Sequence, residues 1–257
     1  MVYFLNLSFD NLMNKKIAIV CSGGGMRCGY AAGVYVALAK ELNFTTPEII
    51  IAGSGGASSS LYYLAQQYEA IKKMATELLA NPKFISPTRF WKIVDVDFLV
   101  DTIFKKYQPL DLERLSSTKS NYFILAQNID TGVTHYFTKK DKIDLFEILK
   151  ATTAAPFFYG KKISIDGSRY VDGTTYSSLK KMVDKAIELG ADKVLVIDCR
   201  TLMTRLPTYK IGQVFVLRNL SIPSQLLTRN YKKLQKTYDM GYDDVFGNED
   251  LRAWLTN

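Results

Sequence analysis

The segment "IIIAGSGGASSS", Ile49–Ser60, joins a run of isoleucines to a cluster of small residues. The isoleucines predict a buried strand, and the apolar spacing after the cluster predicts a helix from Ser58 to about Ala80. Small residues where a strand turns into a helix occur in phosphate-binding loops and in the sharp turn that carries a nucleophilic serine. The neighbouring segments help to distinguish these two kinds of site.

Strand-like and helix-like segments alternate along the chain. A strand at Lys16–Cys21 precedes a helix over Tyr30–Glu41, and a helix over 179–189 ends at Gly190 before a strand at 193–198. Two hairpins are expected, in 121–137 around Asp130-Thr131-Gly132 and in 161–173 around Asp166-Gly167. The pattern predicts an α/β fold, a three-layer α/β/α sandwich with a mostly parallel central sheet. We expect one domain over residues 1–257, with the motifs between 16 and 200.

A second glycine cluster, "SGGGMRCGY" (Ser22–Tyr30), also lies between a strand and a helix. Successive glycines allow backbone N–H groups at a helix N-terminus to point together at an anion. A dinucleotide site would need a glycine where Cys28 stands and an acidic residue at the end of the second strand. Since both are absent, and no Gly-Lys-Ser/Thr follows, the cluster favours an oxyanion site over a phosphate site.

The cluster Ala52–Gly56 fits a nucleophile turn centred on Ser54. Such a turn needs small residues two positions before and after the serine, because larger side chains would collide there. The Gly55 N–H would join those of Gly23, Gly24 and Gly25 as oxyanion donors. A competing register centred on Gly55 would leave no nucleophile.

A nucleophilic serine needs a base. The one histidine of the chain, His135, lies on an expected hairpin strand, where a surface role is more common. Asp172 ends another expected strand directly before Gly173, and Asp198 ends the strand at 193–198. Hairpin-turn chemistry explains Asp166 fully. From the residues alone, Asp172, His135 and Asp198 remain candidates.

These motifs resemble those of the patatin-like phospholipases, a family of lipid acyl hydrolases. The family's Gly-Gly-Gly-x-Arg-Gly motif is matched by Gly23–Gly25 and Arg27, with Cys28 in place of the last glycine. Its Gly-x-Ser-x-Gly motif is matched by Ser54 and Gly56, with Ala52 in place of the first glycine.

Two further landmarks follow in the family's order. The Asp-Gly-Gly/Ala motif is matched by Asp172 and Gly173, with Thr174 as the departure, and "ATTAAPFFY" (Ala151–Tyr159) resembles the segment that precedes it. Thr174 requires a negative φ, and Cys28 adds a Cβ where the glycine loop meets its helix.

The resemblance implies hydrolysis of fatty-acyl esters of phospholipids, lysophospholipids or related lipids through a Ser54–Asp172 dyad and an acyl-enzyme. Arg27 would orient the glycine loop, meet the lipid phosphate or pair with a nearby carboxylate. The alternative is a catalytically degenerate relative that binds lipid or a partner without hydrolysing it.

The segment Phe84–Tyr107 interrupts the alternation and combines aromatic with basic residues. Phe90, Trp91, Phe98 and Phe104 among lysines predict a lid or interfacial insertion over the site. The alternative places these aromatics in the core of a helical insertion.

Net charge, apolar content and cysteine usage restrict the classes of partner and the cellular location to be expected. The formal net charge of +8 favours anionic surfaces, but no interleaved basic and aromatic face or known module indicates nucleic-acid binding. Residues 1–16 lack the features of a signal peptide, and no apolar run is long enough to span a membrane. The chain has three cysteines, Cys21, Cys28 and Cys199. The two that end apolar strand-like runs, Cys21 and Cys199, are expected as buried thiols in a reducing compartment. A lipid substrate at a membrane surface, no cofactor, no metal and a cytoplasmic location with peripheral membrane contact are the expectations.

Overall fold

The computed structural model describes residues 15–200 and 208–256. The expectation about residues 1–16 falls almost entirely outside them. The strands are β1 (Ile17–Cys21), β2 (Ile49–Ala52), β3 (Asn121–Asn128), β4 (Thr134–Phe137), β5 (Ile163–Ile165), β6 (Ser168–Asp172), β7 (Lys193–Ile197) and β8 (Val214–Leu217). The longer helices are α1 (Gly29–Leu42), α2 (Gly55–Leu64), α3 (Tyr68–Thr76), η4 (Phe98–Tyr107), α5 (Leu145–Thr153), α6 (Leu179–Glu188), α7 (Tyr231–Asp243) and α8 (Glu249–Thr256). The short ones are η2 (Gly25–Cys28), η3 (Leu78–Ala80), α4 (Leu112–Ser117) and η5 (Gly173–Thr175).

The strands form one sheet of eight, in which hydrogen-bonded neighbours follow the path β5-β6-β3-β2-β1-β7-β8 and β4 also pairs with β3. The five strands from β3 to β8 in this order are parallel to one another, whereas β4, β5 and β6 join as antiparallel strands. The expected α/β fold is confirmed, with a mixed sheet whose centre is parallel. Both predicted hairpins, β3–β4 and β5–β6, are present.

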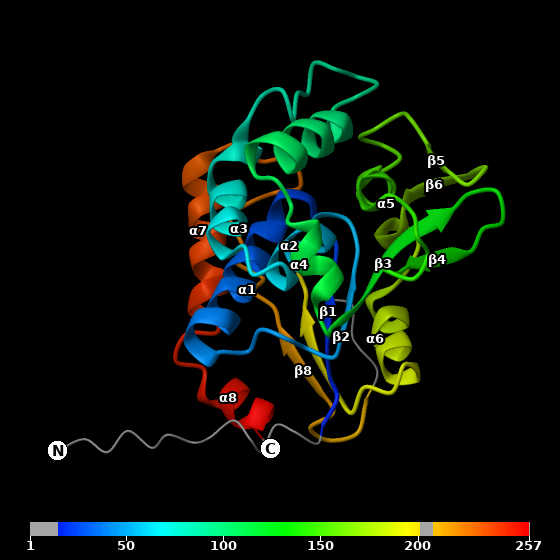
Figure 1. Cartoon of the computed structure of the whole chain (residues 1–257). Coiled ribbons are helices and arrows are strands. Elements are labelled where there is room, and N and C mark those ends of the chain that lie inside the picture. The colour runs from blue at the N-terminus through cyan, green and yellow to red at the C-terminus, as the bar shows by residue number, and fades with distance from the viewer. Residues whose placement is uncertain (1–14, 201–207, 257) are drawn as a thin grey trace.

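Helices cover both faces of this sheet (Figure 1). Alternate residues of β1 point to opposite sides: Ile19 and Cys21 join the core under α1, α2, α3 and α7, while Ala18 and Val20 join the core under α6. Three layers result, as the sequence pattern predicted.

The prediction of one continuous helix from Ser58 to about Ala80 is wrong. The segment is divided into α2, α3 and η3, and Gln66 between the first two has a left-handed φ of 56°. The Gln67 side chain donates to the Pro109 carbonyl oxygen and accepts from the Asp111 N–H, at 2.8 and 2.9 Å. Long-range bonds of this kind offset the cost of the break, and they are not visible in the apolar spacing.

The segment Phe84–Tyr107 begins with a bridge between Ile85 and Val94 and ends in the π-helix η4. Phe104 is buried in the core, as the second interpretation required, whereas Phe90 and Trp91 are exposed. The segment therefore has a buried base and an aromatic tip. Whether it acts as a lid stays a prediction.

Candidate active site

Strand pairing explains why residues far apart in sequence meet at one point. Ile124 of β3 pairs with Ala52 of β2 on one side and with Phe137 of β4 on the other. Ala126 pairs with His135 of β4 and with Asp172 of β6, so β6 lies on the same side of β3 as β2. Because β2 ends at Ala52, β6 takes its place beside β3, and Asp172 comes to lie beyond the end of β2, next to Ser54.

Ser54 occupies a strained turn between β2 and α2. Its φ of 54° and ψ of −140° lie in a region that non-glycine residues seldom adopt, at a cost of about 1–3 kcal/mol. The Ser54 N–H donates to Thr152 Oγ1 at 2.9 Å, and that hydroxyl donates to the Leu125 carbonyl oxygen at 2.7 Å. The tight conformation falls on Ser54, in agreement with the register centred on the serine.

Glycine is required beside this turn because of close packing. A Cβ on Gly53 would lie 2.5 Å from Thr174 Cγ2 and 2.9 Å from Leu125 Cγ. A Cβ on Gly23 would overlap the Thr174 hydroxyl. The two glycine clusters of the sequence therefore meet around Thr174.

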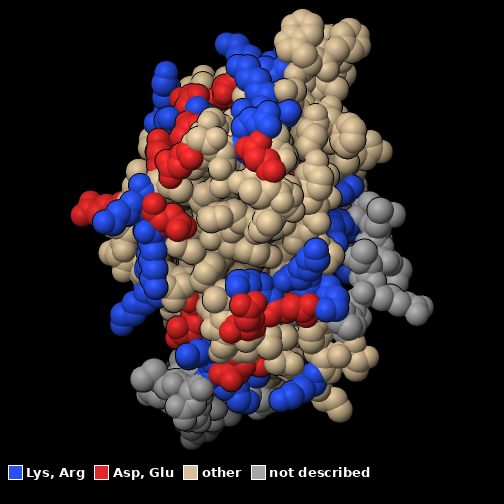
Figure 2. Space-filling view, turned by 90° about the vertical axis from the view of Figure 1, so that its right-hand side faces the viewer, with Lys and Arg blue, Asp and Glu red and all other residues tan. Residues whose placement is uncertain are grey.

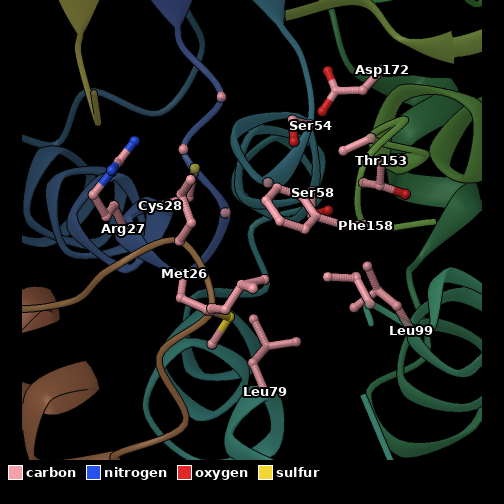
Figure 3. Close-up of a pocket in the computed structure, with 18 of the residues that line it drawn as sticks. Met26, Arg27, Cys28, Ser54, Ser58, Leu79, Leu99, Thr153, Phe158 and Asp172 are labelled. Atoms are coloured by element: carbon pink, nitrogen blue, oxygen red, sulfur yellow. The ribbon is translucent and has the colours of Figure 1, made fainter. Parts of the chain in front are cut away.

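Asp172 is buried, and its carboxylate is directed toward Ser54 (Figure 3). Its Oδ1 accepts hydrogen bonds from the Thr174 N–H at 2.8 Å and from the Thr174 hydroxyl at 2.7 Å. Burial raises the pKa of Asp172 above its ordinary value, and the hydrogen bonds from Thr174 and the Ser54 hydroxyl oppose that rise. A carboxylate of raised pKa beside a hydroxyl is suited to accept its proton.

The glycine loop follows β1 and continues into η2. Gly25 has a φ of 56°, and the Met26 N–H donates to the Leu226 carbonyl oxygen at 3.1 Å. Gly23, Gly24, Gly25 and Gly55 all line the cavity that contains Ser54. An oxyanion site would use the N–H groups of this backbone.

Arg27 braces this loop, since its Nε donates to the Cys199 carbonyl oxygen at 2.9 Å beyond the end of β7. Arg27 also lines the cavity, as does Arg200, which sequence reasoning missed. The loop-orienting role of Arg27 stays a prediction.

The three departures from the family motifs fit the backbone. Thr174 lies in η5 and is not among the residues with positive φ, which meets the condition predicted for it. Cys28 precedes α1 with a φ of −65°, and its buried side chain packs against Gly55. Ala52 is the buried last residue of β2.

The other candidate bases lie elsewhere. His135 is exposed on β4, with its ring 4.3 Å from that of Phe137. Asp198 is fully buried and bonded to Arg200 and Arg218, and these bonds outweigh burial and lower its pKa. Among the described residues, those lining the cavity include Asp172 but neither His135 nor Asp198.

The cavity has a volume of about 350 Å³, within the size range of small-molecule sites. In Figure 3, Met26, Leu79 and Leu99 lie at the opposite end of the cavity from Asp172. Its apolar lining includes Ile71, Met74, Leu79, Phe84, Leu99 and Phe104. Ser54 and Asp172 therefore lie at one end of a largely apolar cavity.

The buried thiols predicted at Cys21 and Cys199 are confirmed, and Cys28 is buried and free as well. Residues 15–200 and 208–256 contain no cluster of His, Cys, Asp and Glu side chains suited to a metal ion. They also contain no helix long and apolar enough to cross a membrane.

The chain resembles known proteins in sequence and in fold. A family model for patatin-like phospholipases covers residues 19–180. The chain is 27% identical over 199 residues to YjjU, an uncharacterized protein of Escherichia coli K12, covering 74% of this chain and 54% of YjjU. The chain thus spans about half the length of that relative. The crystal structure of VipD from Legionella pneumophila aligns with a TM-score of 0.54 at 10% identity, over 90% of this chain and 67% of VipD, and so shares the fold.

Proposed function

The chain belongs to the patatin-like phospholipase family, and from that premise we propose that it is a lipid acyl hydrolase with a Ser54–Asp172 catalytic dyad. The observation that carries the proposal is the pairing of a strained serine with a buried carboxylate at the end of an apolar cavity. Its substrates are fatty-acyl esters of phospholipids, lysophospholipids or related lipids. No cofactor is needed for this chemistry.

In the first half-reaction, Asp172 accepts the hydroxyl proton while Ser54 Oγ attacks the ester carbonyl carbon. The N–H groups of Gly23, Gly24, Gly25 and Gly55 stabilise the negative charge that develops on the carbonyl oxygen. The tetrahedral intermediate then breaks its bond to the alcohol oxygen, which takes the proton from Asp172. The alcohol leaves, and the acyl group stays on Ser54.

In the second half-reaction, Asp172 accepts a proton from a water molecule that attacks the acyl carbonyl. Collapse of this intermediate returns the proton to Ser54 Oγ and releases the fatty acid. The apolar cavity holds the acyl chain in both steps, and Arg27 keeps the glycine loop in place through Cys199.

Because the substrate resides in a membrane, the protein would act as a peripheral protein, and the proposed compartment is the cytoplasm. The segment Phe84–Tyr107 supplies Phe84, Val94, Leu99 and Phe104 to the cavity wall. As an interfacial insertion, it would separate the acyl chain from water during the reaction.

A fluorophosphonate probe tests the nucleophile, because it phosphonylates an activated serine. We expect labelling of the parent at Ser54, located by peptide mass spectrometry, and none in Ser54→Ala. The buried Ser60, bonded to the Gly56 carbonyl oxygen, offers a matched control: Ser60→Ala should label like the parent. An unlabelled parent that binds lipid vesicles would instead indicate the degenerate relative.

A further inference from the structure

Three large aromatic side chains are exposed near the cavity. The exposed fractions are 83% for Phe90, 75% for Trp91 and 83% for Phe157. We call these three residues the aromatic rim. An exposed aromatic patch marks a surface that contacts a partner, because apolar area in water is unfavourable.

The rim is assembled from two segments that hydrogen bonds hold together. The Val94 N–H donates to the Phe158 carbonyl oxygen at 2.9 Å, and the Gly160 N–H donates to the Trp91 carbonyl oxygen at 3.0 Å. Phe157 and Phe158 line the cavity as well. The rim therefore lies beside the cavity, and hydrogen bonds attach it to the cavity wall.

Basic residues accompany the rim. The segments 83–97 and 155–162 contain five basic and two acidic residues. Both acids are paired within this group, Asp95 with Arg89 and Lys92, and Asp97 with Lys92 and Lys161. In Figure 2, uncharged side chains project at the top of the molecule with basic side chains beside them, at the end where both segments lie in Figure 1.

We propose that the aromatic rim inserts into the interface of an anionic lipid bilayer and holds the cavity against it. Trp and Phe favour the boundary between headgroups and acyl chains, and neighbouring lysines are attracted to anionic headgroups. A second copy of the chain fits less well as the partner, because a symmetric contact would bring together the basic residues beside the two rims. The proposal rests on the proposed function for its purpose, but binding itself requires no catalysis.

The chain has two tryptophans, so Trp254→Phe leaves Trp91 as a specific fluorophore. In a Ser54→Ala background, we expect Trp91 emission to shift to the blue on vesicles of phosphatidylcholine and phosphatidylserine. Lipids with brominated acyl chains should quench it. Trp254 packs against Phe215 and donates to the Gly212 carbonyl oxygen, so its replacement could disturb the fold. Cosedimentation of proteins that retain Trp254 with the same vesicles therefore gives a second measurement.

Rim variants give the quantitative test. Phe90→Ser and Phe157→Ser should each weaken vesicle partitioning about tenfold, as expected for the loss of one inserted aromatic side chain. Ile211 is fully exposed ahead of β8, at the end of the parallel strands opposite Ser54, so Ile211→Ser is the matched control and should bind like the parent. Lys161→Glu with Lys162→Glu should reduce binding to anionic vesicles most at low salt.

Three results would overturn the proposal: Trp91 emission unchanged by vesicles, rim variants that bind like Ile211→Ser, or a dimer in solution that Trp91→Ser dissociates. A parent that binds vesicles through the rim but hydrolyses no ester would reject the proposed function and leave this inference standing.

Discussion

Thr174 stands where the family motif has a glycine or alanine, and its hydroxyl donates to the proposed base at 2.7 Å. This bond stabilises the charged form of Asp172 and so lowers its pKa. In Thr174→Val, the bond is lost while the shape is kept. We expect the acid limb of the pH–rate profile to move to higher pH, with activity about tenfold lower on that limb.

Thr174→Ser is the matched control because it restores the donor, and it should return the profile to that of the parent. A uniform loss of activity at all pH values in Thr174→Val, without rescue by serine, would mean that Thr174 only packs between Gly23 and Gly53.

At the scale of the residue, Ser54 was easier to predict than its supports. Ser54 could be found because small residues must flank a tight turn. Asp172 was distinguished from His135 and Asp198 only by the resemblance to the family, and its role as base stays a proposal. Thr152, which accepts from the Ser54 N–H, and Arg200, which lines the cavity, carried no such signal. Their roles depend on the distance between chain segments, which local sequence does not reveal.

At the scale of the element, α1 and α7 pack through glycines. A Cβ on Gly33 of α1 would overlap the Tyr238 carbonyl oxygen, and one on Gly241 of α7 would overlap that of Tyr30. Since backbone must move to admit the methyl group, Gly33→Ala should lower the free energy of unfolding by about 2–3 kcal/mol.

Gly29, on the same helix, provides the control. An added Cβ there would meet its nearest atom, Thr237 Cγ2, at 3.5 Å, which is ordinary contact. Gly29→Ala should therefore leave the denaturant midpoint nearly unchanged. Equal midpoints for both variants would show that the α1–α7 contact is loose.

The far end of the cavity, where Met26, Leu79 and Leu99 lie, should set the length of the acyl chain. Leu79→Trp would add volume there, at the opposite end from Asp172 (Figure 3). We expect the ratio of kcat/KM for a p-nitrophenyl palmitate to that for the butyrate to fall at least about tenfold. Ile211→Ser should keep the parent ratio, and an unchanged ratio in Leu79→Trp would place the acyl chain elsewhere.

Elements with a strong apolar period were predicted well, and the interruptions were not. β1, α1, β2, α6 and β7 agree with expectation to within a few residues. The break at Gln66 and the bridge between Ile85 and Val94 depend on partners distant in sequence. Strand β8 and the packing of α7 on α1 were also missed. The sequence pattern of β8 is short, and that of α7 is largely polar.

At the scale of the whole molecule, the strand pairing both forms the site and buries a charge. Beyond the end of β2, β6 pairs with β3 in its place, and this position buries Asp172. The charge of its carboxylate is therefore removed from water. Since burial raises its pKa above 3.8, the folded protein holds this proton more tightly than the unfolded chain does. The contribution of Asp172 to stability therefore declines as the pH rises from about 4 through the raised pKa.

Asp172→Asn lacks this titration but keeps an acceptor for Thr174. We expect the stability of the variant relative to the parent to increase with pH across that window and then to level off, measured by urea denaturation at each pH. A parent that instead gains stability over the variant as the pH rises would mean that the folded-state pKa is lowered. The prediction of one domain over residues 1–257 is checked by the same curves, which should show one transition.

If Ser54 and Asp172 act together on an acyl ester, removal of either should abolish turnover. The hydrolysis of a p-nitrophenyl ester by the parent, by Ser54→Ala and by Asp172→Asn measures this directly. We expect turnover by the parent and a loss of at least about a thousandfold in kcat/KM in both variants. Activity that survives in Asp172→Asn but not in Ser54→Ala would contradict the dyad and move the base to His135 or Asp198.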